Sequence, residues 1–169
     1  MYKPPYWLYD NIKLDDESIE KLRSNLSEIE VNTEFRSHHR TSYYMKDQEV
    51  YPTSFINERY NVIVENLVKS IGMFYKSRYK YNFWGQLYNK GDYVGQHNHR
   101  PADLSWVHFL DVPEKKCFRF TDTKGNTLVP DEQSNGDLIC FPSWAWHETI
   151  PTDKQRVIVS GNIHFKTSK

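Results

Sequence analysis

The spacing of apolar residues changes near residue 79, and this change constrains the fold more than any other feature of the chain. Before it, apolar residues recur at helical spacing in "DDESIEKLRSNLSEIE" (15–30) and "PTSFINERYNVIVENLVKSIGMFY" (52–75). After it, residues alternate in short runs that glycine and turn-forming residues interrupt. Helical segments followed by strands, without alternation of the two, argue against a parallel α/β sheet.

The first half predicts two amphipathic helices. One face of the first is apolar at Ile19, Leu22, Leu26 and Ile29. One face of the second is apolar at Ile56, Tyr60, Ile63, Leu67 and Ile71. Thr53 and Ser54 precede the second helix and are candidate N-caps. The polar stretch 33–52 predicts a strand and a long loop, and we place His38 and His39 in the loop, with the entrance to a binding site as the less favoured alternative.

The second half predicts short strands separated by turns. The strand-like runs are "YKYNFWGQLYNKGDYVGQHNH" (79–99), "LSWVHFLDV" (104–112), "KCFRFTD" (116–122), "GDLICFPSWAWHETI" (136–150) and "QRVIVSGNIHF" (155–165). This order favours an α+β, mainly β fold: a β-sandwich or jelly roll with helices packed on one face. The 169 residues fit one domain, with 1–78 as mainly helical support and 79–169 as the core.

Composition excludes several classes of protein. Lys+Arg and Asp+Glu number 22 each, so no overall field draws the chain to nucleic acid or to an anionic membrane. No apolar run approaches the roughly 20 residues that span a bilayer, and "MYKPPYWLYD" lacks the layout of a signal peptide. Cys117 and Cys140 lie in strand-like contexts, which predicts that both are buried free thiols. Two cysteines without a disulfide framework predict a reducing cytoplasm as the location, which would be the host cytoplasm for a viral protein.

The stretch "VGQHNHRPADLSWVHFL" (94–110) places two histidines at alternate positions before an apolar run. In a strand, alternate side chains share a face, so we expect the imidazoles of His97 and His99 to project together. Such a pair is a metal site, a surface pair or a hydrogen-bonded core pair, and the pair alone does not decide. His108, within a predicted strand, is expected to be a hydrogen-bonded core residue.

Two later residues make the metal site the favoured interpretation. His147 follows the strand-like "NGDLICFPSWAWH", and Arg156 opens the last strand nine residues later. Imidazole suits Fe, Zn, Cu and Ni, and three ligands leave coordination positions open. The planar guanidinium of Arg matches a carboxylate. The pattern predicts an open metal site beside an Arg that holds an acidic co-substrate.

The segments "GQHNHRPADLSWVHFL" and "GDLICFPSWAWHETIPTDKQR" resemble the 2-oxoglutarate- and Fe(II)-dependent oxygenases, in particular a branch found in bacteria and bacteriophages. The resemblance covers roughly residues 82–165. The family's signature is H-x-(D/E), a distant His and then a basic residue. The resemblance implies a double-stranded β-helix of the jelly-roll type. It also implies an Fe(II)/2-oxoglutarate dioxygenase that hydroxylates a substrate with O2, yielding succinate and CO2.

By position, the resemblance implies that His97 and His147 ligate iron and that His99 stands in place of the carboxylate. Arg156 would pair with the distal carboxylate of 2-oxoglutarate, and Tyr88 is a weaker candidate for a hydrogen bond to the same group. The primary substrate stays open, with a peptidyl side chain or a small molecule favoured and nucleic acid disfavoured.

His99 is the departure from the family's pattern, because a third neutral ligand leaves the site one unit more positive than a carboxylate would. Asp103 and Asp92 are alternative third ligands, ranked after His99. A three-His enzyme of the cupin type, using O2 without 2-oxoglutarate, is a second interpretation. A jelly-roll binding module with a structural metal is a third, and it requires a fourth protein ligand.

Overall fold

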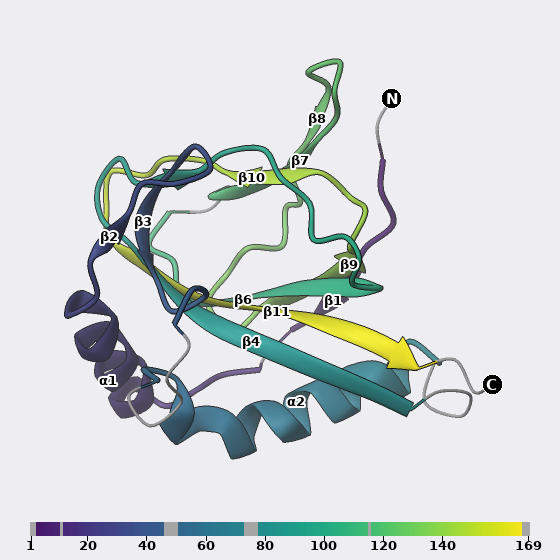
Figure 1. Ribbon diagram of the computed structural model, residues 1–169, viewed down its shortest axis with the longest axis horizontal. Coiled ribbons are helices and arrows are strands. Elements are labelled where there is room, and N and C mark those ends of the chain that lie inside the picture. The colour runs from purple at the N-terminus through teal and green to yellow at the C-terminus, as the bar shows by residue number, and fades with distance from the viewer. Residues whose placement is uncertain (1–2, 11, 46–50, 73–77, 115, 167–169) are drawn as a thin grey trace.

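The computed structural model describes residues 3–10, 12–45, 51–72, 78–114 and 116–166 (Figure 1). In chain order the elements are β1 (Trp7–Tyr9), α1 (Asp16–Ser27), β2 (Val31–Asn32), β3 (Ser37–Thr41), a 3-10 turn (Ser54–Ile56), α2 (Asn57–Ser70), β4 (Arg78–Tyr88), β5 (Tyr93–Val94), β6 (Leu104–Asp111), β7 (Phe118–Thr121), β8 (Thr127–Leu128), β9 (Leu138–Pro142), β10 (His147–Thr149) and β11 (Arg156–Lys166). β4 begins where the apolar spacing changes, and β3 lies in the stretch predicted to contain a strand. β1 and β2, on either side of α1, were not predicted.

Two antiparallel sheets contain these strands. The larger sheet has the order β1-β9-β6-β11-β4-β3-β2, with β5 beside β3, and the smaller has the order β10-β7-β8. Strands from the first half of the chain extend the larger sheet at both edges, because β1 pairs with β9 and β3 pairs with β4. The fold is thus mainly antiparallel β with two helices, as predicted, and every strand pair among the described residues is antiparallel.

Local sequence explains where each helix begins. The side chain of Asp15 accepts a 2.8 Å hydrogen bond from the Ser18 amide and caps α1. The prediction that Thr53 or Ser54 caps α2 through its side chain was wrong. The 3-10 turn carries the chain into α2 instead, and the Thr53 carbonyl accepts from the amide of Ile56. Among the described residues, neither helix is long and apolar enough to span a bilayer.

The larger sheet separates two apolar clusters, because successive strand residues point to opposite faces. Trp106 packs with Leu26 of α1 and Leu67 of α2, whereas the next residue, Val107, packs in the cluster toward the smaller sheet. Figure 1 shows both helices along one side of the larger sheet and β7 and β10 on the other. Both cysteines are buried free thiols, as predicted.

His108 on β6 connects the sheet to α2 and to the N-terminal segment. Its Nε2 lies 2.6 Å from the Ile12 carbonyl oxygen, which can only accept, so Nε2 carries the proton. Its Nδ1 then accepts a 2.9 Å hydrogen bond from the Tyr60 hydroxyl. Burial lowers the pKa of His108 to about 4. The prediction of a hydrogen-bonded core histidine is confirmed.

We predict that His108→Gln weakens the acid sensitivity of the fold. Neutral His108 contributes stability above the ordinary pKa of 6.5, and this contribution is lost as the pH falls toward its folded-state pKa of about 4. Between pH 7.5 and pH 5, the wild-type free energy of unfolding should fall by about 1–2 kcal/mol more than that of the variant. Chemical denaturation at both pH values measures the difference.

Tyr60→Phe is the matched control, because it removes the hydroxyl and keeps the imidazole that takes up the proton. The wild-type pH dependence should persist in that variant. Equal pH dependence in wild type and His108→Gln would contradict the assignment.

Candidate metal centre

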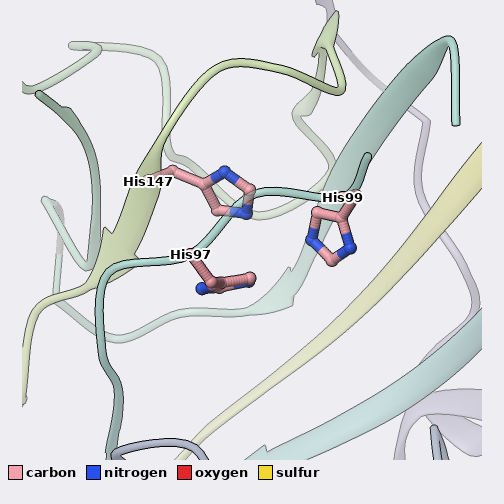
Figure 2. A group of neighbouring side chains, drawn as sticks. All are labelled: His97, His99 and His147. Carbon is pink, nitrogen blue, oxygen red and sulfur yellow. The ribbon is translucent and has the colours of Figure 1, made fainter. Parts of the chain in front are cut away.

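The structure brings together the three histidines that the sequence singles out. One ring nitrogen from each of His97, His99 and His147 lies within 4.8 Å of the others. The ring centroids are 4.3 Å apart for His97 and His147, 4.9 Å for His97 and His99, and 5.0 Å for His99 and His147. Figure 2 shows the imidazoles grouped between the segment that carries His147 and the loop that carries the other two. This group can hold a metal ion.

Backbone pairing, rather than strand alternation, produces the cluster. His97 and His147 form an isolated antiparallel bridge, in which each amide donates to the other's carbonyl at 3.0 and 2.9 Å. His99 lies in irregular backbone, and its amide donates to the Ser143 carbonyl at 2.9 Å. The expectation that His97 and His99 occupy one face of a regular strand was therefore wrong, although their rings do converge.

Hydrogen bonds fix the tautomers of two imidazoles. The Nδ1 atoms of His97 and His147 lie 2.8 and 2.9 Å from the carbonyl oxygens of Gly95 and Ala145. A carbonyl oxygen only accepts, so each Nδ1 carries the proton and each Nε2 keeps a free lone pair.

The electrostatics keep all three rings neutral. Burial lowers the pKa of His97, lowers that of His99 to about 3, and lowers that of His147 well below its ordinary range. Neutral imidazole is the form that coordinates metal. The donor set therefore fits a divalent transition metal.

The two alternative carboxylate ligands are held elsewhere. Oδ2 of Asp103 accepts a 2.7 Å hydrogen bond from the Phe165 amide. Oδ1 of Asp92 lies 2.7 Å from Nδ1 of His38, and its Oδ2 accepts from the Asn89 amide at 2.8 Å. Within the described part of the chain, the candidate metal cluster contains histidines and no carboxylate.

Arg156 is fully buried and only partly hydrogen-bonded. Its Nη1 donates to the Ile150 carbonyl at 2.9 Å and to Oγ1 of Thr152 at 2.8 Å. Its Nε and Nη2 have no hydrogen-bond partner, and no carboxylate of the described residues forms an ion pair with it. A buried charge without a counter-ion is costly, so this guanidinium can accommodate an anion with two unused donors.

Tyr88 packs against Arg156 and lines the same cavity as the three histidines. The two residues are register partners on β4 and β11, and the guanidinium carbon lies 4.2 Å from the Tyr88 ring centroid. The Tyr88 hydroxyl donates to Oε1 of Gln86. Burial raises the pKa of Tyr88, which keeps the hydroxyl protonated.

Two cavities meet at the histidines. The inner cavity, of about 30 Å³, is lined by Tyr88 and by all three histidines. The outer cavity, of about 420 Å³, lies against His97 and His99 and is open to solvent. Both are lined by Trp84, Gln86, Val94, His97 and His99. A metal ion held by the histidines would therefore lie where an inner compartment joins an outer one.

His39 is a residue of the site that the sequence analysis missed. It lies in β3 and not in a loop; it is buried, and its ring stacks on Tyr88 with centroids 4.9 Å apart. Burial lowers its pKa to about 4. The missed signal is the alternation of buried polar residues at Ser37, His39 and Thr41, which hydrophobic periodicity does not detect.

Gly95 is the second missed residue. Its amide donates to the Arg36 carbonyl at 2.9 Å, and its own carbonyl accepts from Nδ1 of His97. A Cβ at this position would lie 2.8 Å from the Arg36 carbonyl oxygen. Gly95 is therefore required for the close approach of the 35–36 turn to the histidine cluster.

Solved structures that share this fold include 2-oxoglutarate- and Fe(II)-dependent oxygenases. A Pseudomonas putida prolyl-4-hydroxylase matches with a TM-score of 0.67 at 16% identity, over 98% of this chain and 94% of that one. The viral collagen prolyl hydroxylase of Paramecium Bursaria Chlorella virus-1, in complex with 2-oxoglutarate, matches with 0.59 at 15%, over 94% of each chain. The epimerase SnoN of nogalamycin biosynthesis matches with 0.64 at 13%, over 95% of this chain and 76% of that one.

At these low sequence identities, the TM-scores show that the chain shares the fold of these proteins. No protein-family model matches the chain, and no curated protein matches it by sequence. What the likeness adds to the geometry is that a metal-binding cluster and a buried Arg occur here within the fold of the 2-oxoglutarate oxygenases.

We predict that Gly95→Ala weakens both the fold and metal binding. The added Cβ would displace the Arg36 carbonyl and loosen the support of His97, with a loss of about 1–3 kcal/mol in the free energy of unfolding. Calorimetric titration with Ni(II) should show weaker binding. Gln96→Ala, which changes the neighbouring exposed side chain, should leave the affinity unchanged. Wild-type stability and affinity in Gly95→Ala would exclude this role for Gly95.

Proposed function

We propose that the protein is an Fe(II)/2-oxoglutarate-dependent oxygenase and a member of the family it resembles. The observation that carries the proposal is Arg156, a buried guanidinium with two unused donor nitrogens in a fold that also holds three neutral histidines. Under this proposal the chain is a double-stranded β-helix of the jelly-roll type, in which 1–78 support the core and 79–169 carry the site.

His97 and His147 would hold the iron through their Nε2 lone pairs, and His99 through one of its ring nitrogens. When bound, iron and 2-oxoglutarate supply the oxidising power for O2 activation, with succinate and CO2 as co-products. The carbonyls of Gly95 and Ala145 keep the rings of His97 and His147 in the metal-binding tautomer.

Arg156 would hold the distal carboxylate of 2-oxoglutarate. Charge-assisted hydrogen bonds from its unused Nε and Nη2 would replace the missing counter-ion and fix the co-substrate in one orientation. The Tyr88 ring packs against the guanidinium and holds it in place. Tyr88 is the weaker candidate for a direct contact, since its hydroxyl already donates to Gln86.

The apolar side chains that line the inner cavity would keep water away from the reaction. Phe118, Phe141 and Ile158 line it with apolar side chains, which exclude bulk water from the co-substrate. The primary substrate would reach the histidines through the outer cavity, and the expected outcome is its hydroxylation.

The substrate is expected to be a peptidyl side chain or a small molecule. Matching structures include a Trichoplax adhaerens prolyl hydroxylase in complex with a peptide fragment and the Streptomyces hygroscopicus protein HygX with nickel, 2-oxoglutarate and hygromycin B bound. Both kinds of substrate are therefore compatible with this fold.

A cupin-type enzyme that uses O2 without 2-oxoglutarate is the second candidate. The absence of a carboxylate from the described histidine cluster favours it. The cupin-type reaction assigns no role to the buried Arg156, which has no counter-ion among the described residues. We therefore rank this candidate second. A structural metal in a binding module would need a fourth protein ligand, and the cluster among the described residues offers three.

We predict that anaerobic protein loaded with Fe(II) develops a metal-to-ligand charge-transfer band on addition of 2-oxoglutarate. Arg156→Gln should weaken 2-oxoglutarate binding by about 30-fold or more, because it removes one partner of a buried charge pair. Arg156→Lys should retain part of the affinity. Titration of the band measures all three proteins.

Arg40→Gln is the control, because the Arg40 side chain donates an exposed hydrogen bond to the Ser27 carbonyl. Circular dichroism and Fe(II) binding show whether Arg156→Gln is folded and keeps its metal site. A variant that passes both tests has lost only its affinity for 2-oxoglutarate. A folded, iron-loaded wild type without the band would refute the proposed function. An unchanged affinity in Arg156→Gln would refute the role of Arg156.

We also predict that 2-oxoglutarate strengthens metal binding more here than in a variant with a carboxylate ligand. Three neutral ligands leave the metal's charge uncompensated, so the dianion should raise Mn(II) affinity by about 5- to 150-fold, the usual range of coupling between sites. His99→Asp should bind Mn(II) more tightly alone and show a smaller enhancement. His99→Asn separates loss of the imidazole from gain of charge. Equal enhancement in wild type and His99→Asp would overturn this prediction.

A further inference from the structure

A continuous series of ring contacts leads from the surface to the histidine cluster. Phe35 and Tyr44 have centroids 6.5 Å apart, and Tyr44 meets Tyr43 at 4.9 Å. Tyr43 meets Trp84 at 4.7 Å, and Trp84 meets His99 at 5.6 Å. We call Phe35, Tyr44, Tyr43 and Trp84 the aromatic path; all four line the outer cavity.

The outer end of the aromatic path is unusually exposed. Phe35 is 78% exposed, Tyr44 48% and Tyr43 45%. A contiguous group of large apolar side chains at the surface marks a binding surface. A ligand that extends from the cavity across the surface would cover more of these rings than a compact ligand would.

Backbone strain coincides with this exposure. Phe35 and Arg36 have φ values of 53° and 57°, in the left-handed region that bulky residues rarely adopt. The Gly95 amide holds the turn by donating to the Arg36 carbonyl, while the Gly95 carbonyl holds His97. One residue therefore positions both the outermost ring and a candidate metal ligand, which is the expected arrangement when the two act on one ligand.

The polar side chains of the outer cavity are uncharged. Asn32, Ser37, Thr41 and Asn98 line it, and no Lys, Arg, Asp or Glu is among the described residues that do so. A charged side chain or a phosphate would lose its hydration there without gaining a counter-ion. Amide and hydroxyl groups, in contrast, match the donors and acceptors of a peptide main chain.

We propose that the aromatic path binds an uncharged stretch of polypeptide, with a flat apolar side chain packed against Phe35 and Tyr44 and the residue to be oxidised next to His99. The inference rests on the proposed function for the reaction at the histidines. A chain that continues across the surface covers the exposed rings, which a compact molecule does not. Single-stranded nucleic acid also stacks on rings, but it requires cations for its phosphates.

Binding can be tested without turnover. The full chain, loaded with Mn(II) and 2-oxoglutarate under anaerobic conditions, is titrated calorimetrically with blocked nonapeptides of Gly, Ser and Gln that carry a central Phe, Lys or Glu. N-acetylphenylalaninamide and a thymidylate nonamer are the other probes. The Phe peptide should bind at least about tenfold more tightly than every other probe.

Variants of the aromatic path then locate the binding surface. Phe35→Ala and Tyr44→Ala should each weaken binding of the Phe peptide by about three- to tenfold, the worth of one ring contact. Phe55→Ala removes an exposed ring outside this cavity and should have no effect. Mn(II) and 2-oxoglutarate affinities should stay unchanged in all three variants.

Three results would overturn the proposal: no effect of either path variant, equal binding of the charged peptides or thymidylate, or equal binding of N-acetylphenylalaninamide. Failure of the proposed function is distinguishable, because it would abolish the charge-transfer band. In that case, peptide binding that depends on Phe35 would still support polypeptide binding by the aromatic path. A normal band without peptide binding would refute that role of the aromatic path and leave the proposed function intact.

Discussion

Two backbone hydrogen bonds between His97 and His147 are the interaction on which the site depends. They join two segments that are far apart in the sequence: His97 lies outside the strands, whereas His147 begins β10 and also pairs with Phe120 of β7. The carbonyls that orient the rings come from the same segments, at Gly95 and Ala145. Displacement of either segment would therefore disturb the position and the tautomer of a candidate ligand at once.

Charge balance explains the remaining features of the site. The histidines are neutral because burial disfavours their protonated forms, and the described cluster brings no carboxylate to compensate a metal ion. Arg156 adds a second uncompensated positive charge in the interior. A site of this kind favours an anionic co-substrate, whereas the uncharged outer cavity disfavours a charged substrate. Under the proposed function, the histidines and Arg156 therefore select an anion, and the outer cavity an uncharged ligand.

Sequence patterns predicted the elements best where the residues themselves supply the signal. Apolar spacing located α1 and α2, alternation located β4, and short strand-like runs located β6 and β11. The residue types of His97, His147 and Arg156 indicated a metal beside a carboxylate. The failures share a physical cause. His39 and the His97 bridge depend on contacts with distant segments, and buried polar alternation in β3 leaves no hydrophobic signal.

The sequence by itself determined the positions of both helices and of the longer strands after residue 78, and the donor types available to the site, because periodicity and side-chain chemistry are local properties. Only the tertiary structure decided which donors meet. It placed the carboxylates of Asp92 and Asp103 in other hydrogen bonds, left two nitrogens of Arg156 without partners, and aligned Phe35 with His99 along the aromatic path. These outcomes follow from packing between distant segments, where competition among partners assigns each polar group its place.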